Sequence, residues 1–200
     1  MRRVNEIFYS LQGEGHHAGM PAVFVRFSGC NLACPFCDTD HIDGVPVSDP
    51  EIARTVASYP ANWIVLTGGE PSLWIDDEFI RYLKDVTGKK IAIETNGTRP
   101  LPAGIDWVTL SPKTGICGPE GNADVVISHA DEIKVVDVGQ ELEQSFSLPC
   151  RTADTLMYLQ PCFVADEREW EVNRRRAVGR VMADPRWTLS VQLHRFLDIP

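Results

Sequence analysis

The sequence predicts a single-domain α/β fold in which mostly parallel strands form an incomplete, trimmed barrel. A length of 200 residues suits one compact domain with a sizeable core. Short apolar runs alternate along the chain with helix-like segments, which is the pattern of a parallel sheet. Helix signals are sparse between Asn96 and Thr155, so we expect too few helices to close a full barrel. No domain boundary is visible, and residues 1–200 are interpreted as one domain.

The expected strands are short runs of apolar and β-favouring residues that lie between turn residues. The run from Ala22 to Phe27 is the strongest of them, and the run ending at Leu66 has the character of a buried strand. The predicted strands are residues 4–11, 22–27, 63–66, 90–94, 107–110, 132–136, 155–159 and 188–193.

Helix starts and stops are clear at three places in the sequence. Ser48 precedes Pro50 and Glu51, and this combination of a capping side chain, an early proline and an acid is a helix start. Gly88 and Pro185 stop two later helices. The predicted helices are residues 48–58, 76–86 and 166–184, and the Gly/Pro-rich residues 115–121 are expected to form a surface loop.

Charge and hydropathy exclude several classes of protein. The formal net charge of -9 argues against sequence-independent binding to nucleic acid, which depends on neutralising phosphates. The apolar stretch at the amino end is broken by Asn5 and Glu6, unlike a signal peptide. No apolar run is long enough to span a bilayer. We therefore expect a cytoplasmic protein without a membrane partner.

Polar motifs follow six of the expected strands at their carboxyl ends. In parallel α/β folds these ends form the rim on which active sites are built, and core packing alone does not explain six such coincidences. The sequence therefore predicts an active site at this rim. The motifs are Gly29-Cys30, Thr67-Gly68-Gly69-Glu70-Pro71, Glu94-Thr95-Asn96-Gly97, Ser111-Pro112-Lys113, Gln160-Pro161 and Gln192-Leu193-His194.

Three of the six cysteines lie within eight residues, at the spacing CxxxCxxC: Cys30, Cys34 and Cys37. Structural zinc sites need four ligands, and iron–sulfur cubes usually take four cysteines. Three thiolates would leave one iron open to a small molecule, as catalysis requires. The alternatives are a redox sensor or a zinc site completed by His41, His16 or His17. The scattered Cys117, Cys150 and Cys162 are interpreted as ordinary thiols, with a second cluster as the lesser alternative.

The cysteine loop resembles the signature of the radical S-adenosylmethionine (SAM) superfamily. Phe36 matches the aromatic residue often found before the last cysteine, and Thr67-Gly68-Gly69-Glu70 resembles the glycine-rich segment that contacts the methionine moiety. The resemblance implies a barrel of the radical SAM type and a 4Fe-4S cluster whose open iron binds SAM. One electron from that cluster would cleave the sulfonium and release a 5′-deoxyadenosyl radical.

A finer resemblance, to the 7-carboxy-7-deazaguanine synthase family, covers the whole chain. It implies ring contraction of 6-carboxy-5,6,7,8-tetrahydropterin with loss of ammonia, in queuosine and 7-deazapurine biosynthesis. It also implies regenerated SAM, a magnesium ion, a homodimer and a reduced flavodoxin-like electron donor. The motifs that carry it are Leu11-Gln12-Gly13-Glu14-Gly15, Arg26-Phe27-Ser28-Gly29-Cys30-Asn31-Leu32, Cys37-Asp38-Thr39, Thr67-Gly68-Gly69-Glu70-Pro71, Glu94-Thr95-Asn96-Gly97, Ser111-Pro112-Lys113 and the end from Gln192-Leu193-His194 to Pro200.

The resemblance also implies a role for individual positions. Cys30, Cys34 and Cys37 would hold the cluster, and the Thr39 hydroxyl would bind magnesium, which prefers oxygen ligands. The residues expected to bind SAM are Phe36, Cys37, Asp38, Gly69, Glu70, Ser111, Pro112, Lys113 and Gln160. The residues expected to bind the pterin are Leu11, Gln12, Gly13, Glu14, Arg26, Thr67, His194 and the carboxylate of Pro200.

Each of these roles has a structural alternative. Gln12 and Glu14 could cap a turn, Thr39 could cap a helix or turn, and His194 could be an ordinary histidine at a sheet edge. Asp38 could act as an outer acceptor, Glu94 could pack beneath the site, and Trp170 is assigned to the core or a dimer interface. Two other functions also stay open: a glycyl-radical activating enzyme, and a non-catalytic zinc or redox-sensing module.

Overall fold

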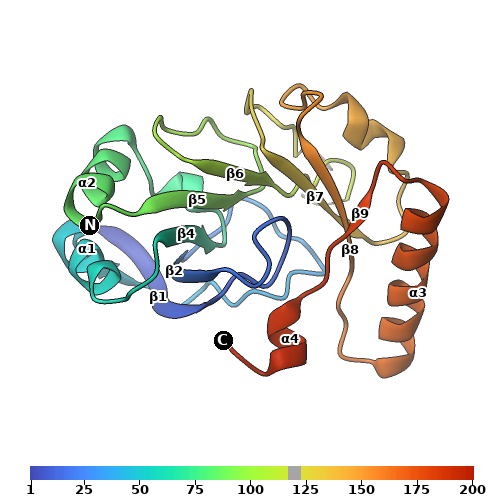
Figure 1. The fold of residues 1–200 in the computed structure, drawn as a ribbon, viewed down its shortest axis with the longest axis horizontal. Coiled ribbons are helices and arrows are strands. Elements are labelled where there is room, and N and C mark those ends of the chain that lie inside the picture. The colour runs from blue at the N-terminus through green and yellow to red at the C-terminus, as the bar shows by residue number, and fades with distance from the viewer. Residues whose placement is uncertain (117–122) are drawn as a thin grey trace.

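The computed structural model describes residues 1–116 and 123–200, which form a nine-stranded sheet (Figure 1). The predicted loop at 115–121 lies mostly outside the described residues, as does Cys117. The strands are β1 (Arg2–Leu11), β2 (Pro21–Phe27), β3 (Val45–Val47), β4 (Trp63–Gly68), β5 (Lys90–Thr95), β6 (Trp107–Leu110), β7 (Glu132–Asp137), β8 (Leu156–Pro161) and β9 (Thr188–Leu189).

The sheet is open, and most of it is parallel. Its order is β3-β1-β2-β4-β5-β6-β7-β8-β9, with parallel pairing from β2 to β9, so β3 and β9 are its edges. This confirms the predicted α/β class and the incomplete barrel. Because the parallel strands share one direction, their carboxyl ends meet at one rim, as the motif positions predicted.

The first strand runs against its neighbour. β1 pairs with β2 in antiparallel register, with Leu11 opposite Pro21. The connecting segment, residues 12–20, therefore starts at the amino ends of the parallel strands. Two backbone hydrogen bonds join the ends of this segment: the Gln12 N–H donates to the Met20 carbonyl (2.8 Å), and the Gly19 N–H donates to the Gln12 carbonyl (2.7 Å). This segment enters the concave side of the sheet from the end opposite the rim.

Helices flank the two ends of the sheet (Figure 1). α1 (Asp49–Ala57) begins at the predicted Ser48 cap, and the structure shows a capping box there, in which the Glu51 carboxylate accepts from the Ser48 backbone N–H at 3.0 Å. α2 (Asp77–Thr87) ends at Gly88, whose φ of 65° is the left-handed conformation that glycine tolerates. Between β5 and β8, the only helix in the described residues is the short 3₁₀ helix η2 (Glu143–Ser147), as the sparse helix signals predicted.

α3 (Glu167–Ala183) docks through both apolar and polar contacts. Ala177 belongs to the hydrophobic core, and the buried Asn173 amide donates to the Cys162 carbonyl at 2.9 Å. Arg176 and Arg180 form ion pairs with the fully buried Asp137 at the end of β7, at 3.2 and 3.0 Å. These pairs satisfy the buried Asp137 carboxylate as well as orienting the helix.

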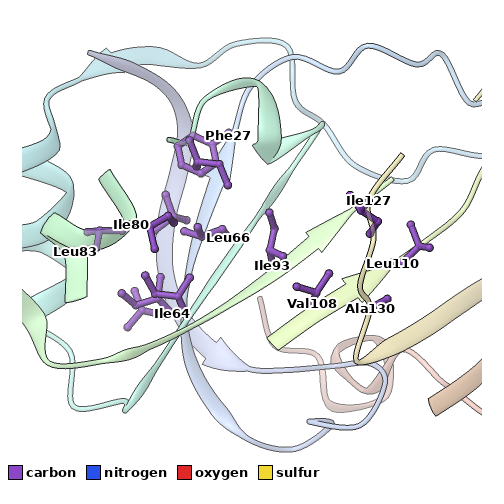
Figure 2. Packing of buried hydrophobic residues seen from close by; sticks show 14 of the residues in the cluster. Phe27, Ile64, Leu66, Ile80, Leu83, Ile93, Val108, Leu110, Ile127 and Ala130 are labelled. Carbon is purple, nitrogen blue, oxygen red and sulfur yellow. The ribbon is translucent and has the colours of Figure 1, made fainter. Parts of the chain in front are cut away.

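Alternating residues of the central strands divide the sheet into two faces. On the convex face, buried Phe27, Ile64 and Leu66 pack against Ile80 and Leu83 of α2 (Figure 2). Burying each of these side chains contributes about 1.5–3 kcal/mol. The concave face carries a smaller buried cluster: Ala22, Phe24, Val65 and Ala92. The polar residues further along β2, β4 and β5 therefore emerge on the concave side of the rim.

The last strand, predicted over residues 188–193, is present but shorter. β9 ends at Leu189, and Leu193 begins the short helix α4 (Leu193–Leu197). The physical reason is that the Leu193 N–H donates to the Gly13 carbonyl at 2.9 Å, which draws the chain away from β8. The short elements β3, η1 (Pro71–Leu73) and α4 were not predicted, because each is fixed by tertiary contacts.

Candidate active site

A cavity of about 580 Å³ opens on the concave side of the rim. Residues from all six rim motifs, the 12–20 segment and α4 contribute to its wall. The predicted site residues that line it are Leu11, Gln12, Gly13, Glu14, Arg26, Cys30, Cys34, Phe36, Cys37, Asp38, Thr39, Thr67, Gly69, Ser111, Lys113, Gln160, His194 and Pro200. The fold thus brings into one cavity residues that are up to 189 positions apart, from Leu11 to Pro200.

The three-cysteine loop is held by close backbone packing. Gly29 has a φ of 87°, and its N–H donates to the His41 carbonyl at 2.7 Å. A Cβ at Gly69 would lie 2.1 Å from the Gly29 carbonyl oxygen, so the second glycine of the Gly-Gly-Glu motif allows the β4 loop to approach the cysteine loop. The Glu70 N–H then donates to the Gly29 carbonyl at 2.9 Å. The two motifs therefore form one rigid corner of the cavity.

The electrostatics of this corner favour a bound metal centre. Burial raises the pKa of the Cys30 thiol, and the negative charges of Glu70, Cys34 and Cys37 raise it further. Thiolates at these positions therefore need a positive partner, which bound iron supplies.

Three thiolates suit a cluster better than a zinc ion, because a closed zinc site takes four ligands, whereas the thiolates of an iron–sulfur cluster bind different irons. Within residues 1–116 and 123–200, no group of three His, Cys, Asp or Glu side chains is arranged around one metal position. His16 and His17, considered as zinc ligands, instead stack on Trp107 and Trp63 with ring centroids 5.0 and 4.8 Å apart.

Glu70 and Pro112 are buried and do not line the cavity. The Glu70 carboxylate accepts from the Ser72 N–H (3.0 Å), the Thr95 hydroxyl (2.7 Å) and the Asn96 N–H (2.8 Å). In the structure this carboxylate therefore satisfies buried donors of the β4 and β5 loops. The expectation that Glu70 and Pro112 contact SAM stays a prediction.

A buried charge network crosses the cavity wall. The Lys134 ammonium on β7 lies 2.5 Å from Glu14 Oε2 and 2.9 Å from Glu94 Oε2, and its side chain is 5% exposed. Glu14 Oε1 accepts from the amides of Gln160 (3.0 Å) and Gln192 (2.8 Å). One lysine thus organises two carboxylates that come from segments 80 residues apart.

The two carboxylates differ in their affinity for protons. Burial alone would raise the pKa of Glu14, but Lys134 and the two amides lower it to about 2. Burial raises the pKa of Glu94 to about 7, because Lys134 offsets it only in part and Glu14 and Glu132 add repulsion. Burial alone would lower the pKa of Lys134, but the facing carboxylates raise it. At neutral pH Glu14 is therefore a fixed anion, and Glu94 is poised to exchange a proton.

Sequence reasoning missed Lys134 altogether. It follows no turn and belongs to no rim motif, because it lies inside β7. Glu94 belongs to a predicted rim motif, but it was assigned no individual role beyond packing beneath the site. The available signal was a lysine within the otherwise apolar run Ile133-Lys134-Val135-Val136, since a charge in the middle of a buried parallel strand requires a partner.

The other end of the cavity is formed by β2, β4 and the last residues of the chain. Arg26 pairs with Glu6 (2.7 Å) and is the register neighbour of Thr67. The His194 ring packs against Gly13, where a Cβ would lie 2.6 Å from Nδ1, and burial lowers the pKa of His194. A Pro200 oxygen accepts from the Ser10 hydroxyl at 2.7 Å, which seats this residue at the cavity.

Two of the other cysteines and Trp170 lie within the described residues. Cys150 is fully buried, as expected of an ordinary thiol. Cys162 is 6% exposed and lines the cavity, although it was not assigned to the site. Trp170 is half-buried and packs edge-on against Phe163 at 5.4 Å between ring centroids.

Comparison with known proteins agrees with this site. A model of the Radical SAM superfamily matches residues 24–115, which contain the cysteine loop and the Gly-Gly-Glu motif. A protein of Bacteroides thetaiotaomicron named 7-carboxy-7-deazaguanine synthase is 51% identical over 100% of this chain and 99% of its own length. This chain belongs to the 7-carboxy-7-deazaguanine synthase family.

Further members and a solved structure support the family assignment. The 7-carboxy-7-deazaguanine synthase of Nitratidesulfovibrio vulgaris is 40% identical, with 99% of each chain covered. The crystal structure of QueE from Escherichia coli has a TM-score of 0.76 and 27% identity, over 96% of this chain and 94% of the other. The 7-carboxy-7-deazaguanine synthase family therefore accounts for the fold of this chain as well as its motifs. Within the described residues, no helix combines the length and apolarity needed to cross a membrane.

Proposed function

We propose that this chain catalyses the radical SAM ring contraction of 6-carboxy-5,6,7,8-tetrahydropterin to 7-carboxy-7-deazaguanine, with loss of ammonia, in queuosine and 7-deazapurine biosynthesis. One observation carries the proposal: a single cavity joins the three-cysteine loop to Arg26 and the Glu14–Lys134–Glu94 network. Cys30, Cys34 and Cys37 would hold a 4Fe-4S cluster, which would supply the one-electron reduction that cleaves SAM.

The polar residues around the cysteine loop hold SAM in this proposal. The Lys113 ammonium, which donates to Ser111 Oγ at 2.6 Å, and the Gln160 amide both line the cavity and offer polar groups to SAM. Asp38 follows the third cysteine and offers a carboxylate to the ribose or ammonium groups of the ligand. The Thr39 hydroxyl provides an oxygen ligand for a magnesium ion.

The charged network selects and orients the pterin. Arg26 pairs with the substrate carboxylate, because a guanidinium binds a carboxylate through two parallel hydrogen bonds. Glu14, held as an anion, accepts from the guanidine-like edge of the ring, and His194, Thr67, Gln12 and a Pro200 oxygen complete the contacts. Glu94 can hold and release a proton at neutral pH, as ring contraction with loss of ammonia requires.

The proposal extends to the assembly and its surroundings. The enzyme acts in the cytoplasm as a homodimer and receives electrons from a reduced flavodoxin-like protein. The net charge of -9 supports a small-molecule substrate and argues against direct binding of nucleic acid.

An anaerobic assay tests the function. The reconstituted protein is incubated with SAM, magnesium, dithionite and the carboxylated tetrahydropterin, and products are identified by mass spectrometry. We expect 7-carboxy-7-deazaguanine, and we expect Arg26→Ala to raise the substrate KM by at least tenfold while iron content is unchanged. Formation of only 5′-deoxyadenosine and methionine would refute the pterin assignment and retain the radical chemistry. Absence of all products from protein with an intact cluster would refute both.

A further inference from the structure

α4 and the residue before it bridge the two halves of the cavity. The Gln192 amide nitrogen lies 3.0 Å from Asp38 Oδ2 and 2.8 Å from Glu14 Oε1. Arg195 Nη2 donates to the same Asp38 oxygen at 2.8 Å. Asp38 directly follows the third cysteine, whereas Glu14 belongs to the charge network opposite. One short segment therefore contacts both the cysteine loop and the residues proposed to hold the substrate.

The Arg195 side chain is fixed from three sides. Its Nε donates to Gln192 Oε1 at 2.7 Å, Nη2 donates to Asp38, and Cζ lies 3.5 Å from the centroid of the Phe163 ring. Phe163 is in turn held by Trp170 of α3. Both ends of the guanidinium are thus oriented by neighbours before any ligand binds.

The energy of this contact does not explain its arrangement. The Arg195 and Asp38 side chains are 30% and 39% exposed, and pairs with such exposure contribute little to stability. The Arg195–Asp38 contact instead orients the Asp38 carboxylate. Because the Gln192 amide bonds to both Asp38 and Glu14, the contact also fixes the Asp38 carboxylate relative to Glu14. A radical step depends on reacting atoms held close together, so an error of about 1 Å can cost about 10²-fold in rate.

We propose that Arg195 is a positioning residue that couples the cysteine loop to the substrate side of the cavity. This inference rests on the proposed function. With Arg195 in place, the radical formed beside the loop takes its hydrogen atom from the substrate. Without it, cleavage of SAM becomes uncoupled. Each uncoupled event consumes one electron from the assay reductant and one hydrogen atom from a protein or buffer C–H bond, and it releases methionine and 5′-deoxyadenosine.

The test compares Arg195→Ala with Arg195→Lys and a matched control. Arg186 is the control because it also forms exposed ion pairs, with Asp184 (2.8 Å) and Glu143 (2.9 Å), and lies 3.9 Å over an aromatic ring, yet it does not line the cavity. We expect Arg195→Ala to release at least fivefold more 5′-deoxyadenosine per product than the wild type. Arg195→Lys should give an intermediate ratio, because it keeps the charge and loses the planar fork. Arg186→Ala should keep the wild-type ratio.

A second readout needs neither cluster nor SAM. Hydrogen–deuterium exchange of the apo protein should be faster at residues 192–199 in Arg195→Ala and unchanged there in Arg186→Ala. Iron content and the unfolding temperature should stay near the wild-type values in both variants.

Each outcome decides the inference. An unchanged ratio of 5′-deoxyadenosine to product in Arg195→Ala overturns it, even if exchange at 192–199 is faster, because Arg195 would then only anchor α4. An equal rise in Arg186→Ala also overturns it. A wild-type protein that makes no 7-carboxy-7-deazaguanine overturns the proposed function together with this inference, so the two failures are distinguishable.

Discussion

Replacing Lys134 by methionine removes the ammonium that lies between Glu14 and Glu94 while it keeps most of the apolar length of the side chain. Two carboxylates would then remain buried without their cation. Breaking a buried ion pair by removing one partner costs about 3–5 kcal/mol. The pKa of Glu14 gives a similar magnitude: its decrease from 4.5 to about 2 corresponds to about 3 kcal/mol, at about 1.4 kcal/mol per tenfold change in the ionisation constant.

The loss of stability in Lys134→Met should be larger at high pH than at low pH. In the wild type, the folded-state pKa of Glu14 lies below its unfolded value, so its stabilisation is complete above about pH 4.5 and is lost as the pH falls through about 2. In Lys134→Met, burial without the cation raises the pKa of Glu14 instead. We therefore expect the variant to lose most stability at pH 8 and less at pH 5, where the carboxyl groups can take up protons.

Thermal unfolding of the apo protein measures this effect. For a chain of this length, 3–5 kcal/mol lowers the unfolding temperature by roughly 10 °C. Lys84→Met is the control, because the accessible Lys84–Asp106 pair (2.8 Å) should contribute at most about 1 kcal/mol. A Lys134→Met protein that unfolds within 2 °C of the wild type at pH 8, or loses as much at pH 5 as at pH 8, would refute the reasoning.

Three further predictions follow from the site. The folded-state pKa of Glu94, about 7, exceeds the ordinary 4.5, so its stabilisation is present below pH 4.5 and is lost as the pH rises through 7. Glu94→Gln should therefore remove about 3 kcal/mol of the fall in unfolding free energy across this pH range, measured by urea unfolding. An unchanged fall would contradict the prediction. Cys34→Ala should lose bound iron and visible absorbance, whereas the buried Cys150→Ala should keep both; equal iron in the two variants would exclude the cluster assignment. Thr39→Ala should raise the magnesium concentration for half-maximal activity by about tenfold, and an unchanged magnesium response would eliminate Thr39 as a ligand.

The parts of the fold that local pattern determines were predictable from the sequence. The strands from 22–27 to 155–159 were placed to within about two residues, because apolar runs and turn residues fix them locally. The end of the chain was not predictable, since β9 stops where Leu193 bonds to Gly13, a contact between residues 180 positions apart. Propensity contains no information about such a contact.

The candidate site also contains residues that were predictable from the sequence and residues that were not. Its rim residues were found because turns at the carboxyl ends of parallel strands are readable in sequence. The buried hydrogen bonds that Glu70 accepts were not predictable, because a motif does not show which N–H groups a carboxylate will face. Lys134 was missed because its significance lies in two partners, Glu14 and Glu94, that only the closed structure brings near it.

The antiparallel first strand has a consequence for how this enzyme can be altered. Because the 12–20 segment enters from the end of the sheet opposite the rim, and α4 returns over it, the two ends of the chain meet at Gly13 and Leu193. The cysteine loop and its glycine partner come from residues 30–69 instead. Gln12, Glu14 and His194 of the proposed substrate site therefore depend on a contact between the two ends, so a homologue's first segment should be exchanged together with its last.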